Sequence, residues 1–347
     1  MIVASYIRHE LTLKKQARTS RGTMNTHEVY YIVLQQGNRI GYGEAAPLKG
    51  LSIDDRPDFE QKVIECIAYI NDGLPIDALP LSGFPSLQFA FETASLSLQY
   101  DVPFMVFDNS FLAGVPVKIN GLVWMNTKDE MLEEAFAKVE QGFDCIKFKV
   151  GALDFDDECR MLEAFRKRHS AFKVELRLDA NGAFATDESS EKLKILSRFE
   201  VHSIEQPIKA GQHDYMHELC LKTPIPIALD EELIGVDVII EGKDLLKIIK
   251  PQYIILKPTL IGGFKNADKW IGYAQSNHIG WWATSALESN VGLNAIAQWC
   301  AEHQHTLPQG LGTGNLYLNN ITSPLAIQNG YLHYNIQEAS WSFPPKP

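Results

Sequence analysis

The stretch Asp144-Cys-Ile-Lys-Phe-Lys-Val-Gly151 decides how the fold of this chain is interpreted. Its alternation predicts a short β-strand in which Lys147 and Lys149 face one side while the apolar residues beside them face the other. Lysine is seldom buried without a partner, so the lysine side is either the exposed face of an edge strand or a site that uses two ammonium groups. The remainder of the sequence decides between these alternatives.

Composition limits the class of protein. The 347 residues carry a net charge of −11 and are 45% hydrophobic, which is typical of a globular chain and does not favour a nucleic-acid surface. No apolar run is long enough for a membrane-spanning helix, and the charged residues at 8–10 interrupt any signal-peptide core. Five scattered cysteines without a C-x-x-C pair are typical of buried thiols in a reducing compartment. We therefore expect a cytoplasmic protein with no nucleic-acid or membrane partner, and the sequence leaves its oligomeric state open.

The N-terminal third has an α+β pattern. Strands are predicted at 2–7, 28–34 and 39–44, and helical spacing follows over 55–72 and 86–98. The polar segment 14–23 is predicted to be a mobile loop.

Strand and helix alternate from Val115 onward, beginning with a strand over 115–123 and a helix over 128–141. Further strands are predicted at 144–150, 173–179, 200–205, 225–230, 252–257, 279–284 and 305–310, with helices near 156–168, 187–198, 212–222, 233–248, 264–277 and 289–303. This pattern predicts an α/β fold, a modified (β/α)₈ barrel over 115–318, with 1–114 as an α+β capping domain that the tail 319–347 joins. A doubly wound open sheet is the structural alternative.

Charged residues recur once per strand–helix repeat. Lys149, Asp179, Glu205, Asp230 and Lys257 each end a predicted strand, and successive differences in their numbers are 30, 26, 25 and 27. In a barrel, strand ends of this kind meet at the C-terminal face, so these side chains are expected to converge.

The three acids suggest a metal site. Asp179, Glu205 and Asp230 would repel one another unless a cation neutralised them, and an all-oxygen set suits Mg²⁺, with Mn²⁺ possible. The alternative is three unrelated strand-end acids in solvent.

The lysines suggest proton transfer next to that metal. A cation on a carboxylate makes the adjacent α-proton more acidic, and a lysine with a lowered pKa can remove it. Lys149 is predicted to be the base, Lys257 to lie on the opposite face of the substrate, and Lys147 to support them.

The motifs Lys147-x-Lys149, Asp179-Ala-Asn-Gly, Glu205-Gln-Pro, Asp230-Glu231 and Lys257-Pro together resemble the enolase superfamily, in its muconate-lactonizing-enzyme subgroup. The resemblance spans nearly the whole chain. It implies a capping domain over a modified barrel and an essential Mg²⁺.

Within that subgroup, the segments Ser285-Ala-Leu-Glu-Ser-Asn-Val-Gly292 and Gly310-Leu-Gly-Thr-Gly-Asn-Leu-Tyr317 are most similar to the family of o-succinylbenzoate synthases. The resemblance implies a lyase for menaquinone synthesis that dehydrates 2-succinyl-6-hydroxy-2,4-cyclohexadiene-1-carboxylate, a small anionic carboxylate. Lys149 would take the α-proton and then help the hydroxyl to leave, and Lys257 would stabilise the enediolate. A racemase of N-acylamino acids or a dipeptide epimerase is the alternative, although 312–314 lacks the acid that dipeptide epimerases of the subgroup usually place there.

Five residues are predicted to contact the substrate. Arg177 lies two residues before Asp179 and could meet a carboxylate or brace the metal site, and Asn181 lies two beyond it. Ser285 and the backbone of Gly312 and Thr313 are candidates for the succinyl carboxylate, with local loop capping as the alternative. By resemblance, the basic segment 15–23 would close over the site.

Overall fold

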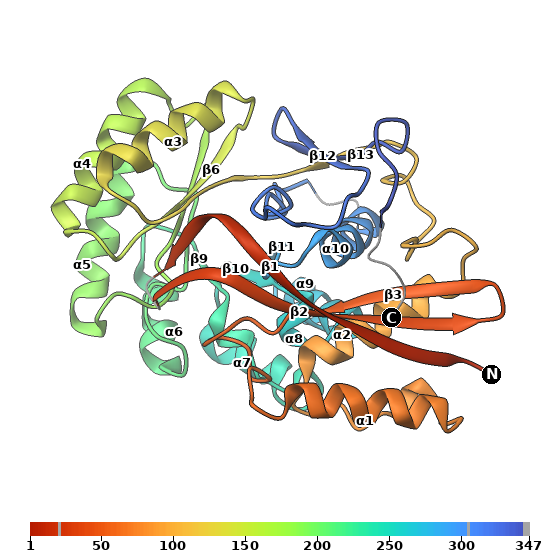
Figure 1. Ribbon diagram of the computed structural model, residues 1–347. Helices are drawn as coiled ribbons and strands as arrows, with labels where there is room; N and C mark the ends of the chain where they lie inside the picture. Colours follow the sequence, from red (N-terminus) through yellow and green to blue (C-terminus); the bar gives the residue numbers. More distant parts are fainter. Residues whose placement is uncertain (20–21, 304–305, 343–347) are drawn as a thin grey trace.

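The structure is a computed structural model that describes residues 1–19, 22–303 and 306–342. Its parts are an antiparallel sheet with two helices, a curled parallel sheet with helices outside it, and a C-terminal hairpin (Figure 1).

The N-terminal sheet has the order β1-β2-β3, with strands Val3–Thr19, Gly22–Gln36 and Arg39–Ala45. Helices α1 (Phe59–Asn71) and α2 (Pro85–Ser97) pack on it. Gly41 and Gly43 permit this packing, because a Cβ at either position would collide with a backbone carbonyl oxygen of α2. The α+β pattern is thus present as predicted.

The predicted loop at 14–23 is wrong for its described residues. Strand β1 continues to Thr19 and β2 begins at Gly22, while residues 20 and 21 lie outside the described part of the chain. The outer half of β1 is held by packing, since Leu11 and Leu13 are buried beside Tyr317, and Leu13 forms a β-bridge with Tyr317. Contacts with residues distant in sequence therefore extend the strand, although the local polar pattern predicted a loop.

The second part alternates strand and helix as expected. The predicted strand over 115–123 is divided into two pieces, which join different sheets. The elements are β4 (Val117–Lys118), β5 (Gly121–Val123), α3 (Lys128–Glu140), β6 (Cys145–Lys149), α4 (Phe155–Arg168), β7 (Glu175–Asp179), α5 (Thr186–Leu196), β8 (Ser203–Glu205), α6 (His213–Lys222), β9 (Ile227–Leu229), α7 (Lys243–Ile249), β10 (Tyr253–Leu256), α8 (Pro258–Ile261), α9 (Phe264–Ser276), β11 (Gly280–Ala283) and α10 (Asn290–Glu302).

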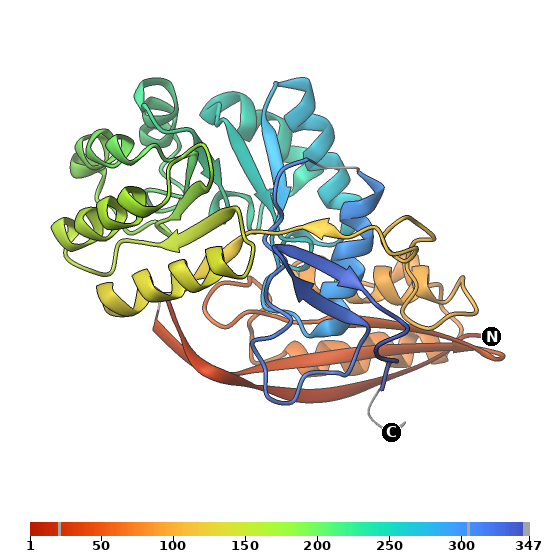
Figure 2. The ribbon, with the colours of Figure 1, turned by 90° about the horizontal axis from the view of Figure 1, so that it is seen from above.

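Seven parallel strands form one sheet in the order β11-β10-β9-β8-β7-β6-β5. The sheet curls, and its helices lie on the outer side (Figure 2). Both edges hydrogen-bond to one short segment, because Thr284 pairs with Gly310 and Ile119 pairs with Gln309, both in parallel. A strand was predicted over 305–310. Within it, Gln309 and Gly310 form these β-bridges, and residue 305 lies outside the described part of the chain.

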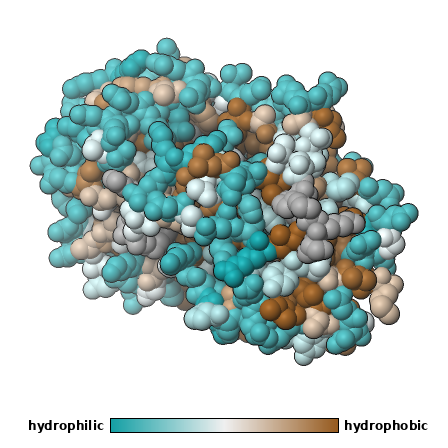
Figure 3. Space-filling view, viewed as in Figure 1, coloured by the Kyte–Doolittle hydropathy of each residue, from teal (hydrophilic) through white to brown (hydrophobic). Residues whose placement is uncertain are grey.

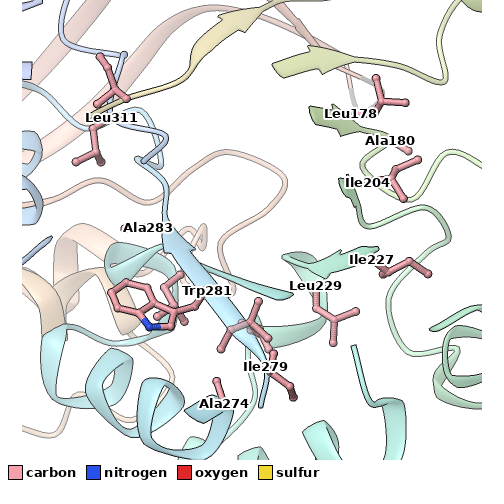
Figure 4. Packing of buried hydrophobic residues seen from close by; sticks show 14 of the residues in the cluster. Leu178, Ala180, Ile204, Ile227, Leu229, Ala274, Ile279, Trp281, Ala283 and Leu311 are labelled. Atoms are coloured by element: carbon pink, nitrogen blue, oxygen red, sulfur yellow. The ribbon is translucent and has the colours of Figure 1, made fainter. Parts of the chain in front are cut away.

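The core lies between the sheet and its helices. Outward-facing strand residues such as Leu178, Ile204, Ile227 and Leu229 point toward the helices and are buried (Figure 4). On β6, Phe148 packs edge-on against Phe165 of α4 at 5.4 Å between ring centroids. Because side chains alternate along a strand, this packing directs the two lysines of β6 to the inner side.

The C-terminal segment contacts both parts of the chain. Strands β12 (Leu325–Gln328) and β13 (Tyr331–Tyr334) form a hairpin, and β13 pairs antiparallel with β4. Trp341 stacks on Phe104 with centroids 4.1 Å apart, and Phe104 stacks on Tyr42 of the N-terminal sheet. Residues 343–347 of the predicted tail lie outside the described part.

The surface is mainly polar on the face shown in Figure 3, where hydrophilic residues cover the helices at the left and apolar residues form separate patches. Among the described residues, no helix is long and apolar enough to cross a membrane.

Candidate active site

Six charged side chains meet at the C-terminal ends of the parallel strands. Lys149 is in register with Asp179, and Asp179 with Glu205, so their side chains lie side by side. Asp230 and Lys257 directly follow the next two strands. With Lys147 they are all buried, between 0% and 8% exposed. The structure therefore brings the six residues together, and β6 is an interior strand rather than an exposed edge.

Asp179 is the centre of one half of this cluster. The Lys149 ammonium donates to its Oδ2 at 2.6 Å, and Lys147 Nζ lies 2.9 Å from the same oxygen. The backbone N–H of Asn181 donates to Oδ1 at 3.1 Å. Burial raises the pKa of Asp179, but the two ammonium groups outweigh it and hold that pKa well below its usual value.

Glu205 and Asp230 form the other half. Lys147 donates to Glu205 Oε2, and Lys257 donates to Asp230 Oδ2 and lies 4.0 Å from Glu205 Oε1. Glu205 Oε1 accepts no hydrogen bond although it is buried. Burial, and then repulsion by Asp179, raises the pKa of Glu205 well above its usual value.

The pKa values of two of the lysines are raised by the neighbouring carboxylates. Burial lowers the pKa of Lys147, but the Asp179 and Glu205 carboxylates outweigh burial and raise it. For Lys257, Asp230 and Glu205 likewise outweigh burial, and the pKa is raised. In this arrangement, Lys147 and Lys257 are therefore ammonium groups paired with the carboxylates.

The three acids fit a hard divalent cation by their chemistry. As they stand, turned toward the lysines, no three His, Cys, Asp or Glu side chains within the described residues form a metal-holding group. Asp179, Glu205 and Asp230 nevertheless offer only oxygen, and one buried oxygen of Glu205 lacks a partner. Burial and then repulsion by Asp179 raise the pKa of Glu205, and a cation would relieve that repulsion.

Two residues of the strand-end loops support the cluster. Asn181 was predicted to bind substrate; it accepts a hydrogen bond from Lys149 at 2.8 Å and donates to Glu231 at 2.9 Å. Gln206 was not predicted, and its side-chain oxygen accepts the backbone N–H of Asp230 at 3.2 Å. Both have positive φ, 45° and 40°. Gln206 directly follows Glu205 in the Glu205-Gln-Pro motif, and this position in the sequence could have identified it as a supporting residue of the site.

A pocket opens beside the lysines. It is lined by Lys147, Lys149 and Lys257 and by apolar side chains, which include Leu48 and Leu51 from the N-terminal module. The remaining lining residues are Asn120, Leu122, Trp124, Thr284, Ser285, Ala286, Leu287, Gly310, Gly312 and Thr313. Three of the five residues predicted to contact substrate are thus at this pocket.

The Ser285 hydroxyl has no hydrogen bond left for a ligand. It donates to Glu288 at 2.5 Å and accepts from Thr313 Oγ1 at 2.7 Å and from the Leu287 N–H at 3.1 Å. A hydroxyl has one proton and two lone pairs, so these bonds favour the alternative of local loop capping, and the contact of Ser285 with the succinyl carboxylate stays a prediction. Glu288, which sequence reasoning missed, is fully buried.

Arg177 does not reach the pocket. Its guanidinium donates to Glu175 at 2.7 Å and to the Pro308 carbonyl at 2.9 Å, and it lies 4.1 Å from the ring centroid of Trp282. Arg177 shares a strand face with Asp179, but its guanidinium contacts Glu175, Pro308 and Trp282, so the geometry does not support the predicted substrate contact.

The N-terminal module holds the loop that carries Ser285. His27 on β2 contacts the Leu287 carbonyl at 3.0 Å, and the Tyr317 hydroxyl donates to the same oxygen at 2.6 Å. Leu287 has a φ of 68°, which costs energy for a residue other than glycine. These contacts keep its side chain in the pocket wall.

A known family model matches the part of the chain that carries these acids and lysines. The model for enolase C-terminal domain-like proteins matches residues 130–338. The chain therefore belongs to the enolase superfamily.

Individual relatives give a finer comparison. The chain is 41% identical to an o-succinylbenzoate synthase from Desulfotalea psychrophila, over 94% of this chain and 98% of the relative. The crystal structure of MenC from the same organism has 38% identity and a TM-score of 0.86, covering 96% of this chain and 99% of the other. An N-succinylamino acid racemase from Amycolatopsis is 24% identical over 94% of this chain and 90% of the relative.

Proposed function

We propose that the chain is an o-succinylbenzoate synthase, a lyase that dehydrates 2-succinyl-6-hydroxy-2,4-cyclohexadiene-1-carboxylate in menaquinone synthesis. The observation that carries the proposal is the pocket between Lys149 and Lys257, whose ammonium groups extend from β6 and from the end of β10. Identity of 41% to a synthase over almost the full length of both chains supports this reaction rather than another of the superfamily.

Lys149 is the base in this proposal. It would take the proton next to the ring carboxylate and return it to the departing hydroxyl as water forms. Lys257 would stabilise the negative charge that develops on the carboxylate, and Lys147, which contacts both Asp179 and Glu205, would hold those carboxylates in place. The apolar wall suits the ring, and the lysines suit the anionic groups.

Asp179, Glu205 and Asp230 would hold Mg²⁺, or Mn²⁺ in its place. When bound, the cation supplies positive charge that makes an α-proton beside a carboxylate easier to remove. Asp230 and Glu205 raise the pKa of Lys257, so weaker ion pairs to these carboxylates would lower it.

The finer architecture and location belong to the same proposal. We infer that Gln309 and Gly310 close the curled sheet as the eighth member of a modified (β/α)₈ barrel over 115–318, because they bridge both of its edges. Residues 1–114, joined by the tail 319–347, would be the capping domain. The enzyme would act in the cytoplasm on a small dianionic carboxylate.

A racemase of N-acylamino acids is the second candidate. Two lysines on opposite sides of a pocket are what a two-base racemase needs, and the Amycolatopsis relative bears such a name. A dipeptide epimerase is less well supported, since Gly312-Thr313-Gly314 offers no carboxylate for a substrate ammonium group.

The test uses purified protein with Mg²⁺ and the cyclohexadiene substrate. We expect the diene absorbance to disappear with formation of o-succinylbenzoate, identified by mass. A parallel incubation of N-succinylamino acids in D₂O would show exchange of the α-proton if the chain is a racemase. Exchange there without any loss of diene absorbance would overturn the synthase proposal.

A further inference from the structure

A chain of hydroxyl groups runs from the pocket wall to a buried carboxylate. Thr313 Oγ1 donates to Ser285 Oγ at 2.7 Å, and Ser285 Oγ donates to Glu288 Oε2 at 2.5 Å. Glu288 also accepts hydrogen bonds from the Thr259 hydroxyl and from the Ala286 N–H, the latter at 2.9 Å. A carboxylate only accepts, so Glu288 fixes the direction of every donor in this relay.

The direction of the relay determines what Thr313 can do. Its proton is committed to Ser285, and among the described residues no donor reaches its Oγ1. Thr313 lines the same pocket as Lys149 and Lys257. The hydroxyl therefore offers only lone pairs to a ligand, and a carboxylate or carbonyl oxygen placed there would be repelled.

We infer that Thr313 is a specificity-determining hydrogen-bond acceptor and that Glu288 is the positioning residue that makes it one. The group recognised is a neutral donor, a hydroxyl or an amide N–H. The identity of this donor rests on the proposed function. In the proposed substrate it is the ring hydroxyl, which is lost in the reaction. The product has only acceptors, so Thr313 favours the substrate over the product and assists product release.

The first test compares Thr313→Val with Thr313→Ser. For each enzyme, kcat/KM for the cyclohexadiene substrate and the Kd for o-succinylbenzoate are measured. Loss of one neutral hydrogen bond corresponds to about a 3- to 10-fold change. Thr313→Val should lower kcat/KM by that factor without weakening product binding, and Thr313→Ser should behave as the wild type. Equal weakening of substrate and product by Thr313→Val would overturn the inference.

The second test separates the relay from simple packing. In Glu288→Gln the amide oxygen can still face Ser285 and Ala286 while the amide N–H₂ faces Thr259, whose hydroxyl can turn to accept. The relay is then preserved. Glu288→Met removes the acceptor, so Ser285 turns its proton toward Thr313, which then donates into the pocket. We expect about 3- to 10-fold tighter product binding in Glu288→Met only; the same product affinity in both variants would contradict the relay.

A third measurement does not depend on turnover or on the Glu288 variants folding. The Kd values of N-succinylglycine and its N-methyl derivative are measured by calorimetry with wild type and Thr313→Val. The N–H ligand should bind the wild type about 3- to 10-fold more tightly than its N-methyl derivative, and this preference should vanish in Thr313→Val. If Thr313→Val keeps the preference for N-succinylglycine over its N-methyl derivative, the inference is refuted. If the wild type does not consume the cyclohexadiene substrate, only the proposed function is refuted.

Discussion

Glu44 provides a quantitative test of how the N-terminal module is attached to the site. Its buried carboxylate accepts hydrogen bonds from the Ser289 N–H at 2.7 Å, the Ser289 hydroxyl at 2.6 Å and the Gly292 N–H at 2.7 Å. These groups form the first turn of α10, where a helix presents unpaired N–H donors and favours negative charge. Glu44 thus joins β3 to the loop that carries Ser285.

Burial raises the pKa of Glu44 from 4.5 to about 7, against the opposing effect of the Ser289 and Gly292 hydrogen bonds. Between these two values the folded chain holds a proton that the unfolded chain releases. Stability from this group is therefore fully present below about pH 4.5 and is lost as the pH rises through about 7. At about 1.4 kcal/mol per pH unit, the loss is roughly 3 kcal/mol.

Glu44→Gln removes this titration. One backbone N–H would then face the amide N–H₂, so the variant should be about 1–3 kcal/mol less stable than the wild type at about pH 5. By about pH 8 the variant should have gained roughly 3 kcal/mol relative to the wild type. Urea unfolding followed by circular dichroism at both pH values measures the difference, with the exposed Glu241→Gln as control. If the difference in the free energy of unfolding between Glu44→Gln and the wild type is the same at both pH values, the raised pKa of Glu44 is refuted.

Two further predictions concern the metal ligands and the packing of the N-terminal module. Asp230→Asn should weaken Mg²⁺ binding, measured by calorimetry, and abolish turnover while the circular dichroism spectrum is retained; full activity would refute the ligand assignment. Gly43→Ala should lower the free energy of unfolding by about 1–3 kcal/mol or more, because the new Cβ meets the Ala90 carbonyl oxygen. Gly272→Ala, in open space on α9, should instead raise it by up to about 1 kcal/mol; equal denaturation midpoints for the two variants would contradict the packing described.

The sequence was sufficient to locate the six charged residues of the site. Five of them end a strand or directly follow one, and Lys147 lies two residues before Lys149 on the same strand face. Parallel strands place their ends together, so the spacing predicts that Lys149, Asp179 and Glu205 lie side by side, as the register has them. The alternation on β6 was equally informative, because Phe148 faces the helices and thereby turns the lysines inward.

Other features depended on contacts that local sequence does not encode. The polar residues after Leu13 predicted a loop, but packing beside Tyr317, which is distant in sequence, extends β1. Arg177 has the same strand face as Asp179, but its contacts with Trp282 and with the Pro308 carbonyl, both distant in sequence, hold it outside the pocket lining. Ser285 was predicted to contact the substrate and lines the pocket, but the hydrogen bonds of its hydroxyl to Glu288, Thr313 and a backbone N–H became visible only in three dimensions.

The most direct test of the proton-transfer proposal is the rate at which Lys149→Ala consumes the cyclohexadiene substrate in the presence of Mg²⁺. The exposed Lys269→Ala serves as the matched control, and circular dichroism confirms that both variants fold. Loss of a positioned acid–base group should slow turnover by about 10²- to 10⁴-fold or more in Lys149→Ala, with the control unchanged. A Lys149→Ala enzyme within a few-fold of the wild-type rate would contradict the assignment of Lys149 as the base.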